Sequence, residues 1–401
     1  MIKSSFFTNN RSELLKKSAG FTPIVIGANG LVQRTRDDEV FPFEQDGNFW
    51  YLTGISEPDV ILVMGESEEY LILPERNDRH KVFSEQIDKD RLKKISGINK
   101  IYEYDEGWEK LAVSLKKSKN FSTITPPEEY LDTYDVYTNP ASRSLVKKIL
   151  ATNSGLHQKD LSKEIISLRM IKTDEEINCI RKAISYTGEI LTRISENITQ
   201  YKNEHDIAAD LNDFYFRNKL NYAFMPIVAA GKNATILHYK SNKDPIGKKT
   251  SVLIDTGVKF NNYCSDITRT IIKDPNARQK AVYQAVADTQ AYAMSLLKAG
   301  VQMKDYETKV AKFIGSELQK LGLIKEITNE SVRKYYPHGT SHSLGIDVHD
   351  PADYSLPLKP GMVITVEPGI YIPEENIGVR IEDNVLITKD GIEDLSSSII
   401  S

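Results

Sequence analysis

Residues 338–350 read HGTSHSLGIDVHD and hold three of the chain's seven histidines within twelve positions. Packing alone does not explain this density, because a buried imidazole needs a hydrogen-bond partner and nothing in a core calls for three together. The glycines in the segment disfavour a helix. We therefore predict that this histidine segment is a strand or loop that lines a cavity.

Two apolar runs beyond the histidine segment each lead to a glutamate. Glu367 ends the run 363–366, immediately before a Pro-Gly pair, where a buried strand gives way to a turn. Glu382 ends the run GVRIE at 378–382, in which strand alternation places Arg380 and Glu382 on the same face. Taken alone, these two would form an ordinary ion pair. Beside further carboxylates, they indicate a charged pocket.

Two aspartates lie at the ends of earlier apolar runs. Asp255 ends the run 251–255 and Asp266 opens the run 266–272, with turn residues between them. Two adjacent antiparallel strands would present both carboxylates at one end of a sheet. Each aspartate is also ordinary at a strand end or turn, so the pair gains meaning only beside the other acidic residues and the histidines.

Four carboxylates, those of Asp255, Asp266, Glu367 and Glu382, together with one neutral imidazole from the histidine segment, carry a charge of about −4, which two divalent cations would neutralise. Without such cations, some of the carboxylates would take up protons. Oxygen-rich ligation with one imidazole favours a hard or borderline ion. Manganese is therefore the first choice, with cobalt and zinc as alternatives.

The chain of 401 residues exceeds one ordinary compact core, so two domains are expected. Its first part alternates short strand-forming runs with turns, such as residues 65–69, and with helical stretches. We predict an α/β fold with a first domain at 1–155. A second domain at 156–401 begins helical, then turns to strands, with two helices near 277–298 and 303–322.

The composition excludes several classes of protein. Apolar residues at 40% and charged residues at 27% are typical of a folded chain. The net charge of −4 disfavours nucleic-acid binding, and no apolar stretch is long enough for a signal peptide or a membrane span. With Cys179 and Cys264 as the two cysteines, a disulfide framework is excluded. A cytoplasmic protein is expected.

Taken together, these segments resemble the pita-bread metallopeptidases, the family of aminopeptidase P, prolidase and methionine aminopeptidase. The resemblance is carried by 254–257, 265–270, the histidine segment, 366–369 and 380–382. It implies a pita-bread (α+β) catalytic domain at the C-terminal end. Residues 36–58 are similar to the N-terminal, creatinase-like α/β domain of bacterial aminopeptidase P, which methionine aminopeptidases generally lack.

The resemblance also implies a role for each metal-ligating position. Asp255 would chelate one metal, Asp266 and Glu382 would bridge both metals, and His342 with Glu367 would complete the other site. A hydroxide bridging the two metals would then be the nucleophile.

Further residues would act on the substrate. By the same resemblance His238, His349 and Glu367 are expected to be catalytic, with Glu367 doubling as a proton acceptor. The substrate-binding residues would be His238, His338, His349 and Arg380.

The implied activity is a metal-dependent aminopeptidase that releases the N-terminal residue from peptides with proline in second position. We expect a homo-oligomer, either a dimer or a tetramer, that acts on proline-containing peptides. Prolidase, which cleaves Xaa-Pro dipeptides, shares both domains and remains the alternative. Creatinase, which works without metals, and non-catalytic binding proteins of the same fold are disfavoured, because such members have replaced metal ligands and all five positions are present here.

Overall fold

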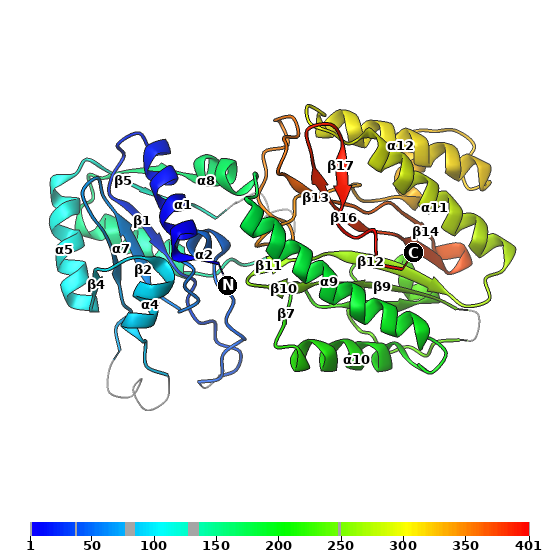
Figure 1. Ribbon diagram of the computed structural model, residues 1–401, viewed down its shortest axis with the longest axis horizontal. Helices are drawn as coiled ribbons and strands as arrows, with labels where there is room; N and C mark the ends of the chain where they lie inside the picture. The colour runs from blue at the N-terminus through cyan, green and yellow to red at the C-terminus, as the bar shows by residue number, and fades with distance from the viewer. Residues whose placement is uncertain (1, 37, 77–84, 127–135, 248–249, 401) are drawn as a thin grey trace. The chain divides into compact units, whose positions relative to one another are not determined.

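The computed structural model of the protein forms two compact units, Met1–Leu168 and Arg169–Ser401. It describes residues 2–36, 38–76, 85–126, 136–247 and 250–400. Asp37, which belongs to the N-terminal stretch that resembles aminopeptidase P, lies outside the described residues. Figure 1 shows the chain coloured from the N-terminus to the C-terminus.

The first unit is built on a six-stranded mixed sheet with the order β4-β3-β2-β1-β5-β6. Its strands are β1 (Ile24–Gly27), β2 (Ile61–Met64), β3 (Glu69–Ile72), β4 (Ile101–Tyr102), β5 (Asn120–Thr123) and β6 (His157–Asp160). Strands β2 and β3 pair antiparallel, with Met64 opposite Glu69. The turn predicted at residues 65–69 is thereby confirmed as a hairpin connection.

Helices cover this sheet because their apolar residues match its buried face. They are α1 (Ser4–Lys17), α2 (Gly47–Thr53), α4 (Lys89–Ser96), α5 (Tyr104–Lys117), α7 (Ala141–Thr152) and α8 (Ser162–Arg169). Trp108 and Leu111 of α5 and Ile149 of α7 are buried in one cluster with Val25 and Val63 of the sheet. Helices α1, α2 and α4 pack against one another. The predicted α/β architecture of the first domain is confirmed.

The first unit continues past residue 155, where the sequence pattern changes and where a boundary was predicted. The change of pattern marks the turn between α7 and β6. Strand β6 pairs in parallel with β5 along four residue pairs, from Asn120 opposite His157 to Thr123 opposite Asp160. The sheet is therefore completed only after this strand, and the division follows Leu168.

The second unit begins with two helices, α9 (Asp174–Glu196) and α10 (Glu204–Arg217). Thr173 and Glu176 form a reciprocal capping box at the start of α9, which satisfies backbone N–H groups that have no partner inside the helix. These helices confirm the prediction that the second domain begins helical. Helices α11 (Ala277–Leu296), α12 (Met303–Lys320) and α13 (Asn329–Tyr335) follow, and the first two match the helices predicted near 277–298 and 303–322.

The strands of the second unit form several small sheets between these helices (Figure 1). They are β7 (Asn221–Tyr222), β8 (Ile227–Ala230), β9 (Ser251–Thr256), β10 (Val258–Phe260), β11 (Tyr263–Cys264), β12 (Ile267–Ile272), β13 (Val363–Val366), β14 (Gly369–Ile372), β15 (Ile377–Arg380), β16 (Asp383–Ile387) and β17 (Ile392–Asp394). Strands β9 and β12 pair antiparallel, with Asp255 opposite Thr268, as the sequence predicted. Within the described ranges, no helix combines the length and the apolar character that crossing a membrane requires.

A close backbone approach joins the two aspartate-bearing segments. A Cβ atom at Gly257 would lie 1.9 Å from the carbonyl oxygen of Ser265, the residue before Asp266. We expect Gly257→Ala to lower the free energy of unfolding by about 1–3 kcal/mol, because the backbone must move to relieve the overlap. Urea unfolding measures this change.

Gly391→Ala is the matched control, because a Cβ atom there would meet nothing within 4 Å. We expect its free energy of unfolding to stay within about 0.5 kcal/mol of the wild type. Equal unfolding midpoints for the two variants would contradict the close approach at Gly257.

Candidate metal centre

Three of the predicted ligands meet in one group. Asp266 precedes β12, Glu382 follows β15, and His342 lies in the histidine segment. One ligand atom from each lies within 4.8 Å of the others, so that together they can hold a metal ion. We call these three residues the metal group.

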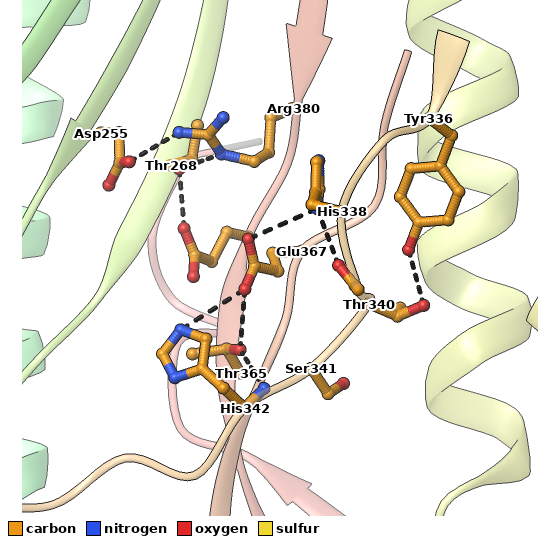
Figure 2. A network of polar contacts seen from close by, with 12 residues as sticks. Asp255, Thr268, Tyr336, His338, Thr340, Ser341, His342, Thr365, Glu367 and Arg380 are labelled. Atoms are coloured by element: carbon orange, nitrogen blue, oxygen red, sulfur yellow. Dashed lines mark hydrogen bonds and ion pairs between the residues drawn. The ribbon is translucent and has the colours of Figure 1, made fainter. Parts of the chain in front are cut away.

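The other two predicted ligands lie at the ends of neighbouring strands. Glu367 follows β13, and its Oε1 is 3.4 Å from His342 Nε2, which is itself 3.4 Å from Asp266 Oδ2. Asp255 lies in β9 and is buried. The strand ends of the second unit thus carry the four carboxylates; Figure 2 shows Glu367 beside His342, and Asp255 beside Arg380.

One carboxylate oxygen of Asp255 accepts a hydrogen bond, and the other has no hydrogen-bond partner. Its Oδ2 accepts a hydrogen bond of 2.6 Å from Arg380 Nη2. Its Oδ1 is buried and has no hydrogen-bond partner. An unpaired buried acceptor of this kind is costly, and a cation bound at Oδ1 would remove that cost. This oxygen therefore fits a metal ligand.

The pKa values of the carboxylates reflect their crowding. Burial raises the pKa of Asp266 well above its ordinary value, and the charges of Asp255 and Glu367 raise it further. Burial and then Asp266 raise the pKa of Glu382 in the same way. For Glu367, burial followed by the charge of Glu382 raises the pKa to about 8. Nearby cations reverse this effect, because they favour the ionised form.

The histidine segment is a loop, and its hydrogen bonds hold His342 in place. The backbone N–H of His342 donates to Thr365 Oγ1 at 3.1 Å, and that of Glu367 donates to Thr340 O at 2.8 Å. Glu307, on α12, accepts from the backbone N–H groups of Thr340 at 3.0 Å and Ser341 at 3.2 Å. The loop predicted from the glycines is confirmed.

Arg380 pairs with Asp255 and reaches Glu382 through a hydroxyl group. Its Nε donates to Thr268 Oγ1 at 3.0 Å, and the Thr268 hydroxyl donates to Glu382 Oε2 at 2.7 Å. Its Nη1 donates to Tyr371 Oη at 3.0 Å. Figure 2 shows this arrangement from Asp255 across Arg380 to Thr268.

Two of the remaining predicted histidines, His338 and His349, contact the site, the first beside Glu367 and the second beside His342. His338 Nε2 is 2.8 Å from Tyr371 Oη, and the ring centroid of His349 is 4.3 Å from that of His342. Burial, followed by Arg380, lowers the pKa of His338 to about 3. Burial, followed by His342, lowers the pKa of His349 to about 4. His238 is exposed, and its charge contributes to lowering both pKa values.

Sequence patterns did not single out several residues that support the site. Thr268 and Tyr371 are neutral, and their partners are distant in the chain. Glu307 lies on a helix whose acidic and basic residues predict only a solvated face. The one usable signal was position in the chain, since Thr268 lies inside the segment 265–270 and Tyr371 is four residues from Glu367.

Comparisons with known proteins agree with this geometry. The family model described as metallopeptidase family M24 matches residues 178–389, and the one described as aminopeptidase P, N-terminal domain, matches residues 7–124. The chain is 29% identical to an Escherichia coli Xaa-Pro aminopeptidase, over 98% of this chain and 95% of that protein. It is 31% identical to human Xaa-Pro aminopeptidase 3, over 88% of this chain and 74% of that protein.

A solved structure gives the same likeness in three dimensions. Escherichia coli aminopeptidase P with the inhibitor Pro-Leu superimposes with a TM-score of 0.88 at 27% identity, covering 100% of this chain and 96% of that one.

The raised carboxylate pKa values predict how metal binding depends on pH. Because Glu367 has a pKa of about 8 in the folded chain against an ordinary 4.5, its protonated form favours folding. The contribution of this group to the stability of the metal-free protein is therefore full below about pH 4.5 and is lost as the pH rises toward about 8. We expect manganese to raise the melting temperature more at about pH 8 than at about pH 5, and to release protons on binding.

Thermal unfolding and titration calorimetry in buffers of different ionisation enthalpy measure these two effects. Glu367→Gln is the control variant, and it should release fewer protons than the wild type. Equal stabilisation at both pH values, with no proton release, would contradict the prediction.

Proposed function

This chain belongs to metallopeptidase family M24, and from that membership we propose that it releases the N-terminal residue from peptides whose second residue is proline. The observation that carries the proposal is the metal group, with ligand atoms within 4.8 Å of one another, in a chain that also matches the N-terminal domain of aminopeptidase P. The relatives that align with most of this chain include Xaa-Pro aminopeptidases.

The proposed site would hold two divalent cations through Asp255, Asp266, His342, Glu367 and Glu382. Manganese is the first choice of metal, with cobalt or zinc as alternatives. The ligands' charge of about −4 matches two such ions. Asp255 Oδ1 is buried without a hydrogen-bond partner, which supports its role as a metal ligand. When bound, such a pair supplies a bridging hydroxide as nucleophile and a Lewis acid for the scissile carbonyl.

The protein's own residues would bind the substrate and move the proton. Glu367 would accept the proton of the attacking water, since its Oε1 lies beside the proposed ligands, 3.4 Å from His342 Nε2. The imidazoles of His338 and His349, whose pKa values are lowered to about 3 and about 4, can donate or accept a hydrogen bond, and together with His238 they would contact the peptide. Arg380 would hold Asp255 in its ligating orientation through their 2.6 Å contact.

The bond before proline is a tertiary amide, because proline has no amide hydrogen and its φ is restricted. A pocket shaped for its ring can favour Xaa-Pro peptides over others, since specificity is a difference of affinities. The Escherichia coli structure with the inhibitor Pro-Leu supports this choice for the present chain. Prolidase activity on dipeptides is the second candidate, because prolidases also carry both domains.

The proposed setting is the cytoplasm. Cys179 and Cys264 are buried free thiols, which suits a reducing compartment. The substrates there would be proline-containing peptides.

A substrate series tests the activity directly. With saturating manganese, we expect kcat/KM for Xaa-Pro-Yaa peptides to exceed that for Xaa-Ala-Yaa by about tenfold or more, because a site built for the proline ring loses its contacts with alanine. Release of the first residue is followed by chromatography. Comparable rates would refute the proline requirement, and cleavage of Xaa-Pro dipeptides alone would favour prolidase.

Removing one ligand charge tests the metal assignment. We expect Glu382→Gln to lower turnover by more than about a hundredfold and to reduce bound manganese, because a neutral amide is a weaker ligand than a carboxylate. Turnover and metal content are measured on the same preparation.

Glu393→Gln is the matched control, since Glu393 forms an exposed ion pair with Arg181. It should retain both activity and metal. Full metal content with normal turnover in Glu382→Gln would contradict the assignment of Glu382 as a metal ligand.

A further inference from the structure

A buried cluster of charges lies at the far end of the histidine segment. Arg169 Nη2 is 2.6 Å from Asp350 Oδ1 and 2.7 Å from Asp347 Oδ2, and Lys172 Nζ is 3.0 Å from Asp350 Oδ2. The side chains of Arg169, Lys172 and Asp350 are only 2%, 1% and 1% exposed. None of these residues belongs to the proposed metal or substrate contacts.

The Asp350 carboxylate closes the turn that carries His349. Its Oδ1 accepts from the backbone N–H of Asp347 at 3.2 Å, and its own backbone N–H donates to Ser343 O at 2.9 Å. It also fills the space beside Gly345, where a Cβ atom would lie 2.6 Å from the carboxylate. Asp350 therefore ties together both ends of the turn from Ser343, next to His342, to His349.

The position of the His349 ring depends on this turn. The ring packs edge-on against His342 at 4.3 Å between centroids, but no hydrogen bond to its nitrogens occurs among the residues that the structure describes. Both nitrogens are thus left for a substrate. Because no side chain holds them by a hydrogen bond, the backbone conformation determines where they point.

Stability alone is a weak reason for such a cluster. Burying ionised groups is costly, and well-packed apolar residues often give equal or greater stability than a buried ion pair. A buried carboxylate between two cations does, however, allow few arrangements of the backbone around it. A role in fixing the geometry of the turn explains its charge and its burial together.

We propose that Asp350, held by Arg169 and Lys172, is a positioning residue that orients the His349 imidazole toward the substrate. This inference rests on the proposed function, in which His349 contacts the peptide. It adds three residues that act through His349 and touch neither metal nor substrate.

A double-mutant cycle with Asp350→Asn and His349→Ala tests this dependence. On a Xaa-Pro-Yaa peptide with saturating manganese, we expect each single variant to lower kcat by about tenfold or more and to keep its metal. If Asp350 acts through His349, Asp350→Asn has no further effect on kcat in the His349→Ala background. Effects that multiply in the double variant would overturn the proposal, as would normal turnover in either single variant.

Arg169→Lys is the second test variant, used if Asp350→Asn fails to fold. It keeps the buried positive charge but loses the guanidinium group that contacts Asp347 and Asp350 together. We expect a decrease in kcat of about threefold or more, again absent in the His349→Ala background. A decrease of the same size in both backgrounds would overturn the proposal.

A control separates positioning from loss of stability. Glu69→Gln breaks the contact of 2.7 Å with the buried Arg11 in the first unit, so it should lower the melting temperature without changing kcat. If Glu69→Gln lowers kcat as much as Asp350→Asn does, the effect is one of general stability and the proposal fails.

A crystal structure of Asp350→Asn gives a readout that does not depend on activity. We expect the His349 ring to move away from its edge-on contact with His342, and an unmoved ring would overturn the proposal. If the wild type cleaves no peptide in the substrate series, the proposed function fails, while this structure still decides whether Asp350 positions His349.

Discussion

Mutual repulsion among buried carboxylates is the constraint on which the second unit depends. Asp255, Asp266 and Glu382 are 8%, 6% and 2% exposed, and Glu367 lies within 3.4 Å of the same imidazole as Asp266. Arg380 contributes one positive charge, so the group remains strongly acidic. Such a site is stable only with protons or cations bound. The raised pKa values and the affinity for metal are therefore two consequences of one arrangement.

The arrangement is possible because each acidic residue is anchored through its backbone. The N–H of Asp266 donates to Asn384 Oδ1 at 3.1 Å, and the N–H of Glu382 donates to Thr268 O at 3.1 Å. The strands thus hold the carboxylates together against their repulsion. Hydrogen bonds around a metal site orient its ligands in this way, and they matter nearly as much as the ligands. Thr268 illustrates this, since its hydroxyl group donates to one oxygen of Glu382.

Local patterns predicted the residues that carry charge, but they did not predict the partners of those residues. The strand ends at Asp255 and Glu367 could be read from apolar runs, because burial and alternation leave a periodic signal. The partner of Arg380 could not be read in this way. Strand alternation, taken alone, would pair Arg380 with Glu382, yet β15 ends at Arg380 and the guanidinium group contacts Asp255 instead. Such pairings depend on how separate strands meet, which no single segment encodes.

The two ends of the histidine segment are anchored by different chemistry. At the first end, Glu307 accepts hydrogen bonds from the backbone N–H groups of Thr340 and Ser341, and burial raises the pKa of this carboxyl. At the other end, Arg169 and Lys172 hold the pKa of Asp350 below its ordinary value, although burial opposes them. The first anchor uses neutral donors, while the second depends on buried cations. The two anchors share no residue, and the predicted ligand His342 lies between them in the chain, so the loop around it is held from both sides.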